Sequence, residues 1–260
     1  MVGVFLGIYL DKLSYDIEKD SIQSANKRGE KQKESFFLYN FSHYKQLLNT
    51  NFMVQNSYVE MGVIVMIEKV DFTYNDEITV VNQEQYEAHL RLYNGYVNTI
   101  NKIDDILYHG DAQRDQSNST FSYYRELKRG ETFALDGVIL HELYFSNIGG
   151  SVQEPDQFVK EIISKDFGGF EKWQEDFIAA AKASRGWAVL CFDQRSQMFR
   201  DISLDAHDLG NIAYSAPILV IDMYEHAYFL QYADNKVEYI NNFMKNINWE
   251  VVASRLSWLT

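Results

Sequence analysis

The feature that most constrains the fold is a short apolar run that ends on an acid. Residues 217–221 read Pro-Ile-Leu-Val-Ile, which predicts a buried strand, and Asp222 follows at once. A carboxylate at the end of a buried strand is costly unless it meets a cation or hydrogen-bond donors. A helix is predicted next, with His226 one turn along, so a carboxylate and an imidazole can converge on one ion. The alternative is that Asp222 only caps this helix.

Upstream of this block the sequence predicts two long helices. Asn82, with Gln85 three residues later, has the form of a capping box at the start of the first helix. Beyond it one stripe of residues recurs at steps of three and four: Tyr86, His89, Tyr93, Tyr96, Ile100 and Ile103. A polar loop over 110–122 separates this helix from a second one over about 120–147.

The C-terminal half alternates helical and strand-like segments. Helices are predicted over 155–166, 169–184, about 223–233 and 235–256, and strands over 187–192, 197–203 and 217–221. This order predicts an α+β fold, in which an N-terminal long-helix hairpin packs on a C-terminal α/β half with a small three-stranded antiparallel sheet. We therefore predict a helical-hairpin domain over 80–150 and an α/β domain over 151–260. Residues 1–70 form an N-terminal extension of unknown role, with a Val- and Ile-rich strand over 61–67.

Composition excludes several classes of function. The chain has 24 Lys and Arg against 37 Asp and Glu, a formal net charge of −13, which argues against a nucleic-acid partner. An anionic substrate would need local cations at its site. Cys191 is the single cysteine, so no internal disulfide forms, which fits a reducing compartment. No apolar stretch of about 20 residues is present, so we expect no membrane partner, and a cytoplasmic location is the default expectation.

The six histidines are the main candidates for metal chemistry. His43 and His109 stand in polar surroundings and are expected to be solvated. His89 and His141 lie on the two predicted helices, and each taken alone is more often a hydrogen-bonded core histidine than a ligand. Together with the acid and imidazole of the 217–228 block, they give three imidazoles and one carboxylate. That set suits iron, manganese or zinc.

The 222–228 block also carries a resemblance. It reads Asp-Met-Tyr-Glu-His-Ala-Tyr and resembles the Asp-x-Trp-Glu-His-Ala-Tyr motif of the iron/manganese superoxide dismutase family. Residues 166–173 resemble that family's Phe-Gly-Ser-Phe-x-x-Phe segment, and 185–187 resemble its Gly-Ser-Gly-Trp. Asn248-Trp249 resembles the closing Val-Asn-Trp. The resemblance covers about 80–258.

The resemblance implies a superoxide dismutase with one iron or manganese ion per chain. It assigns the metal ligands to His89, His141, Asp222 and His226. It also implies catalytic roles for three further residues. Tyr96 would guard substrate access and proton supply, Trp187 would form the aromatic wall, and His207 would hydrogen-bond the metal's solvent. The usual helix position for that last task, four residues before His141, holds Gly137.

The implied partners are superoxide and further copies of the chain. Glu225 resembles the glutamate that reaches the partner subunit's ligand histidine across a homodimer interface, in a dimer or a higher homo-oligomer. Lys236 resembles a cation at the mouth of the substrate funnel.

Several positions depart from the family pattern. His89 and Tyr96 are seven residues apart where the family has eight, so either a helix bulge absorbs one residue or Tyr93 shares the gate role. Tyr224 stands where the family has a tryptophan. Leu92 and Phe229 replace a polar pair together, which suggests a simpler interface. The altered spacing after His89, Tyr224 and the extension over 1–70 motivate a rival hypothesis, a catalytically inactive superoxide-dismutase-like metal-binding or structural protein. A third hypothesis is a different oxygen-using iron enzyme with two histidines and one carboxylate.

Overall fold

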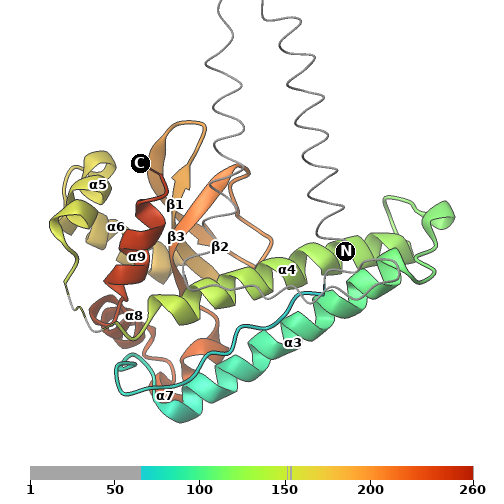
Figure 1. Ribbon diagram of the computed structural model, residues 1–260, viewed down its shortest axis with the longest axis horizontal. Helices are drawn as coiled ribbons and strands as arrows, with labels where there is room; N and C mark the ends of the chain where they lie inside the picture. The colour runs from blue at the N-terminus through green and yellow to red at the C-terminus, as the bar shows by residue number, and fades with distance from the viewer. Residues whose placement is uncertain (1–65, 151, 153, 260) are drawn as a thin grey trace, which may run out of the picture. The chain divides into compact units, whose positions relative to one another are not determined.

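Two long helices lie side by side in the N-terminal part of the described chain (Figure 1). The computed structural model describes residues 66–150, 152 and 154–259. Helix α3 (Gln83–Tyr108) and helix α4 (Tyr123–Asn147) pack on each other and are joined by a loop that holds a short 3-10 helix, η1 (Arg114–Gln116). The predicted hairpin is confirmed. The predicted extension over 1–70 and its strand over 61–67 lie, save for their last residues, outside the described residues.

Polar caps start both long helices. The side chain of Asn82 accepts the N–H of Gln85, and the side chain of Ser122 accepts the N–H of Arg125. Only half of the predicted capping box is correct, because the Gln85 side chain does not return to the N–H of Asn82. That N–H bonds instead to the side chain of Gln231.

An extended segment that the sequence patterns did not assign, residues 69–82, runs along the hairpin. Its Phe72 ring lies 5.9 Å from Tyr93 and 5.3 Å from Phe145, and Val80 is fully buried. The side chain of Asn246 accepts the N–H groups of residues 79 and 80, so these two backbone donors are satisfied without a strand partner.

The C-terminal half is built on an antiparallel sheet. Strands β1 (Trp187–Asp193), β2 (Met198–Leu204) and β3 (Ser215–Asp222) stand in the order β2-β1-β3. The central strand β1 is buried over its first five residues, which explains the unbroken apolar run there. Pro217 lies on the edge strand β3, where a residue without an N–H is tolerated, and the pairing register shifts there.

Helices cover this sheet and join it to the hairpin. Helix α6 (Phe170–Ala183) packs on β1 and β2, whereas α4 and α9 (Trp249–Leu256) contact β3. Helix α5 (Gln157–Phe167) precedes α6, and Gly168 between them adopts a φ of +75° that favours glycine. In the described part of the chain, no helix has the length and apolar character needed to cross a bilayer.

Two predicted helices are wrong in extent. The segment predicted as one helix over 223–233 is a 3-10 turn, η2 (Glu225–Ala227), followed by the one-turn helix α7 (Phe229–Tyr232). The segment over 235–256 is broken into α8 (Lys236–Lys245) and α9, because residues 246–248 make long-range bonds. The N–H of Asn248 bonds to the carbonyl of Asn147, and the Asn248 side chain caps α9.

Candidate metal centre

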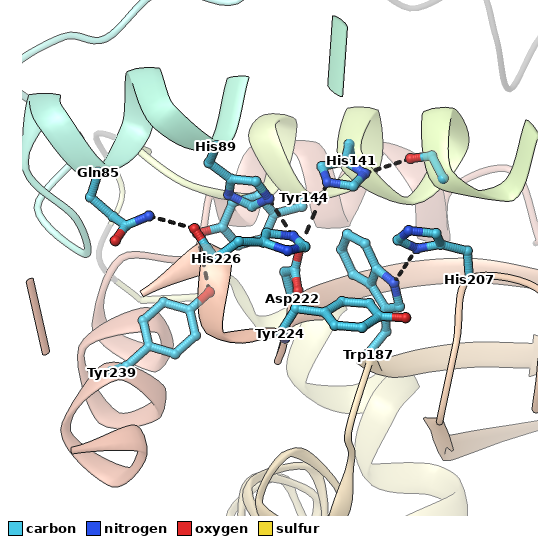
Figure 2. A network of polar contacts seen from close by, with 11 residues as sticks. Gln85, His89, His141, Tyr144, Trp187, His207, Asp222, Tyr224, His226 and Tyr239 are labelled. Atoms are coloured by element: carbon cyan, nitrogen blue, oxygen red, sulfur yellow. Dashed lines mark hydrogen bonds and ion pairs between the residues drawn. The ribbon is translucent and has the colours of Figure 1, made fainter. Parts of the chain in front are cut away.

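Four side chains from four elements converge where the hairpin meets the sheet (Figure 2). His89 comes from α3, His141 from α4, Asp222 from the last position of β3, and His226 from η2. One potential ligand atom from each lies within 4.8 Å of all the others. These are the four residues that the resemblance assigns as ligands.

The Oδ2 atom of Asp222 is the centre of this group. It lies 3.0 Å from Nε2 of His89, 3.2 Å from Nε2 of His226 and 3.8 Å from Nε2 of His141. The side chains of Asp222 and His141 are fully buried, while the side chain of His226 remains 28% exposed. The group is therefore closed on the hairpin side and reaches solvent at His226.

The hydrogen bonding of His141 points to a cation. Its Nδ1 donates to the carbonyl of Gly137 at 2.6 Å, which puts the proton on Nδ1 and leaves a lone pair on Nε2. That Nε2 atom is buried and finds no hydrogen-bond partner among the described residues. Buried polar atoms are rarely left unpaired, and a ligating histidine usually donates its other ring N–H to a carbonyl. The donor set therefore fits a divalent or trivalent transition-metal ion.

The charges of the four groups also favour a cation. Burial lowers the pKa of His89, and it lowers the pKa of His141 to about 3, so both imidazoles are neutral. Burial alone would raise the pKa of the Asp222 carboxyl, but the imidazoles of His226 and His89 hold it well below its ordinary value. Burial opposes protonation of His226, yet the Asp222 carboxylate raises the pKa of that imidazole overall. A negative charge thus lies beside two neutral imidazoles and a third, that of His226, which attracts a proton in place of a cation.

Local backbone geometry places Asp222. On the sheet it pairs in register with Trp187 of β1. Its Oδ1 atom accepts the N–H of Tyr224 at 2.9 Å and thereby holds the turn that follows the strand. Asp222 therefore combines the two roles considered from the sequence. Its Oδ1 caps the next turn, and its Oδ2 faces the three histidines.

The three predicted catalytic side chains surround the group. The Tyr96 ring lies 5.2 Å from His141 and 4.7 Å from His207, and Trp187 lies 5.0 Å from His141. The indole N–H of Trp187 donates to Nδ1 of His207 at 2.9 Å. Gly137 leaves the room for this packing, because a Cβ there would lie 3.1 Å from the Tyr96 ring.

Tyr93 and Tyr96 have different environments. Tyr93 is fully buried, its hydroxyl donates to Glu142 at 2.7 Å, and it accepts the N–H of Val70 at 2.7 Å. Tyr96 is partly exposed and packs on His207. No helix bulge is present in α3, so the bulge hypothesis is wrong. A seven-residue step returns to nearly the same helix face, which keeps Tyr96 beside the group without a bulge.

A solvent-facing hollow of about 470 Å³ opens beside His226. Glu225, Arg185 and Lys236 are among its lining residues. The Lys236 ammonium donates to the carbonyl of Ser184 at 2.7 Å at the end of α6, so it is tied to a helix end as well as lining the hollow. Glu225 is exposed.

Sequence reasoning missed one residue of the site. Gln85 is fully buried and lies one helical turn before His89 on the same face of α3. Its side chain bonds to the backbone of the segment that carries His226 (Figure 2). The available signal was this spacing of four residues from a candidate ligand, but we interpreted Gln85 only as part of a cap.

Comparison with known proteins places the chain in a family. The profile described as iron/manganese superoxide dismutases, C-terminal domain, matches residues 155–255. An iron superoxide dismutase of Aquifex pyrophilus is 41% identical over 192 residues, which is 73% of this chain and 90% of the relative. The chain belongs to the iron/manganese superoxide dismutase family. A manganese/iron superoxide dismutase of Aeropyrum pernix is 35% identical over 194 residues, 71% of this chain and 87% of the relative.

Membership of the iron/manganese superoxide dismutase family confirms the predicted fold class and the resemblance that the 222–228 block carries. A further relative, a manganese superoxide dismutase of Haloferax volcanii, is 33% identical over 166 residues, which is 63% of this chain and 80% of the relative. Relatives named for iron, for manganese and for either metal are therefore all similar to this chain.

Proposed function

We propose that this protein is a superoxide dismutase that converts superoxide to dioxygen and hydrogen peroxide at one iron or manganese ion. We assign the ligands to His89, His141, Asp222 and His226. The observation that carries this assignment is the buried, unpartnered Nε2 of His141, which faces a carboxylate oxygen and two further imidazoles. Family membership supports the activity.

The reaction consumes two superoxide anions and two protons. A bound iron or manganese ion supplies the one-electron couple that this exchange requires. The chain's own residues hold that ion, exclude other ligands and bring protons to the reduced dioxygen species. The buried aromatic and imidazole rings around the group limit access to its open side.

We assign proton supply to Tyr96 and His207. Burial raises the pKa of the Tyr96 hydroxyl, which therefore keeps its proton at neutral pH. Burial lowers the pKa of His207 to about 4, so its ring is neutral. Because Trp187 donates to Nδ1 of His207, the single ring proton lies on Nε2, where it can be donated. Trp187 thus orients His207.

Local cations offset the unfavourable overall charge. The protein carries −13, so its long-range field repels an anion. Arg185 is exposed beside the hollow, and Lys236 lines the same hollow. We infer that these two cations make the electrostatic potential more positive along the path to His226, which favours approach of an anion.

The experiment that tests the function is metal content by elemental mass spectrometry on protein purified without added metal, together with a superoxide-consumption assay. We expect about one iron or manganese per chain, with activity, and loss of both in His226→Ala. Metal-loaded protein without activity would favour the inactive, structural alternative. Full activity without metal would reject the metal mechanism.

We also propose a homodimer or a higher homo-oligomer with Glu225 at the interface. The exposed Glu225 and the partly exposed His226 line one hollow, and Phe229 and Leu230, which follow them in the chain, are 50% and 61% exposed. A second copy would cover these apolar side chains. Light scattering after gel filtration should give at least twice the chain mass, with a lower mass for Glu225→Lys.

Two coarser assignments complete the proposal. We propose that the hairpin over 80–150 and the α/β half over 151–260 act as two units that each contribute two ligands. A cytoplasmic location is supported by the single buried thiol of Cys191, which fits a reducing compartment.

A further inference from the structure

The side chain of Gln85 links helix α3 to the stretch of chain that carries His226. Its Nε2 donates to the carbonyl of His226 at 2.6 Å, and its Oε1 accepts the N–H of Leu230 at 2.9 Å (Figure 2 draws the first). The side chain is fully buried. Both ends of one carboxamide are therefore used on a single stretch of backbone, residues 226–230.

Gln85 bonds to backbone groups that local hydrogen bonds leave unpaired. The N–H groups of residues 227 and 228 bond locally, to the carbonyls of Tyr224 and Glu225. Leu230 is the second residue of the one-turn helix α7, so its N–H lacks a partner within that helix and bonds to Gln85. Its side chain is 61% exposed and does not anchor the turn. Loss of the Gln85 bonds should therefore loosen the turn between His226 and Leu230.

The two partners define the orientation of the Gln85 carboxamide. A carbonyl faces one end and an N–H faces the other, so only one placement of nitrogen and oxygen satisfies both. A second bond reinforces the arrangement. The N–H of Asn82, at the start of α3, donates to the side chain of Gln231 at 2.5 Å. The start of α3 is thus fastened twice to the same stretch.

Gln85 also couples two of the four candidate ligands. It precedes His89 by one turn of α3, and it binds the carbonyl of His226 itself. The Nε2 atoms of these two histidines approach the same oxygen of Asp222 at 3.0 and 3.2 Å. A shift of η2 relative to α3 would separate them, and the Gln85 bonds oppose that shift.

We propose that Gln85 is a positioning residue that clamps the backbone of His226 against α3 and thereby slows loss of the metal ion. The proposal rests on the proposed function in one respect, that His226 is a ligand. Gln85 itself touches neither substrate nor the reacting atoms. Groups that orient metal ligands typically contribute about 10–100-fold in metal affinity.

The test measures how fast metal leaves the loaded protein to an excess of chelator. Gln85→Met keeps the shape of the side chain but removes both bonds, and Gln85→Glu keeps an acceptor for Leu230 while turning a second acceptor toward the carbonyl of His226. We expect both variants to release metal about 10–100-fold faster than the unaltered protein. The matched control is Gln83→Ala, because Gln83 lies on the same helix, is exposed, and has a side chain that bonds to Glu87 on that helix.

A second measurement needs no variant that could fail to fold. The clamp requires the amide of Leu230 to be protected from hydrogen exchange in the unaltered protein, although Leu230 is exposed. We expect slow exchange there, and exchange at the rate of free peptide in Gln85→Met. Free-peptide exchange in the unaltered protein overturns the clamp, as does release of metal at the unaltered rate from Gln85→Glu.

One comparison separates failure of the clamp from failure of the ligand assignment. His226→Ala should abolish tight metal binding whatever Gln85 does. If His226→Ala keeps its metal, the ligand set is wrong. If His226→Ala loses metal but both Gln85 variants retain it normally, the ligand set stands and the clamp is rejected.

Discussion

The indole Nε1 of Trp187 donates a 2.9 Å hydrogen bond to Nδ1 of His207, and this bond fixes which ring nitrogen of His207 carries the proton. Trp187 is also the strand partner of Asp222, so the sheet brings one candidate ligand and the orienting group of a proton donor into register. A change at Trp187 should therefore affect proton transfer before it affects metal binding.

Trp187→Phe tests this relationship. The variant keeps an aromatic ring against His141 but removes the N–H donor to His207. We expect activity to fall by about 10–100-fold, with metal content unchanged, because only the orientation and tautomer of His207 are lost. Activity and metal per chain measured on one sample decide the matter. A proportional loss of metal and activity would mean that Trp187 supports the ligands instead.

Metal binding should stabilise the folded protein, because the ion gives the buried Nε2 of His141 a partner. A metal that binds only the folded state stabilises it by about 4 kcal/mol at a free concentration 1,000 times Kd. That corresponds to a rise in Tm of roughly 10 °C for a domain of this size. We expect this rise when iron or manganese is added to metal-free protein, and none in His141→Ala. An equal rise in the variant would contradict the assignment of His141.

The metal-free protein should lose stability as the pH rises above about 6.5. The pKa of His226 is raised by Asp222 in the folded state, so the folded state holds that proton more tightly than the unfolded chain. Its contribution is full below the unfolded pKa of about 6.5 and disappears as the pH passes the folded value. Thermal unfolding between pH 6.5 and 9, where burial keeps His89, His141 and His207 neutral, should show this slope, and His226→Ala should make it shallower. A metal-free protein with no such slope would contradict the ion pair.

Asp201 is a partly buried acid outside the site, with a covered Oδ2 atom, that should weaken the fold at high pH. Burial, reinforced by Asp176, raises the pKa of Asp201 to about 8, although its Oδ1 accepts the indole N–H of Trp173. An acid with a raised folded pKa contributes stability that is lost as the pH rises from about 4 to about 8. Asp201→Asn should therefore raise the free energy of unfolding at pH 8 by about 1 kcal/mol, with little effect at pH 4.

The control for Asp201→Asn is Asp234→Asn, an exposed acid. Thermal unfolding at both pH values should show no difference for the control. A gain of equal size at pH 4 and pH 8 would show that the benefit of Asp201→Asn does not come from its ionisation.

Arg255 ties α9 to α4 and β3 through neutral acceptors. Its guanidinium donates to the side chains of Asn147 and Ser146 and to the carbonyl of Ile218. Arg255→Met should lower the free energy of unfolding by about 2–4 kcal/mol, because these buried acceptors lose their donor. Urea unfolding measures the change, with the exposed Arg195→Met as the control. If Arg255→Met lowered the free energy of unfolding by less than the control does, the stabilising role of these hydrogen bonds would be contradicted.

The long hairpin, the buried strands and the convergence of Asp222 and His226 could be predicted from the sequence. These features follow from local patterns: a stripe at steps of three and four, an unbroken apolar run, and an acid that a buried strand end tolerates only with a partner. The same patterns overextended the helix over 235–256, because helical periodicity does not register long-range bonds such as that of the Asn248 N–H to the carbonyl of Asn147.

The bonds that hold the site together depend on the packing of distant segments and could not be predicted from local patterns. Tyr93 and Tyr96 belong to the same helical stripe in the sequence, but their partners differ. The Tyr93 hydroxyl donates to Glu142 and accepts the N–H of Val70. The Tyr96 ring packs on His207. The sequence predicts that the Gln85 side chain caps helix α3, but that side chain donates to the carbonyl of His226, 141 residues further along the chain. The physical reason is that a polar side chain's partner is set by which distant segment packs against it, and no local periodicity carries that information.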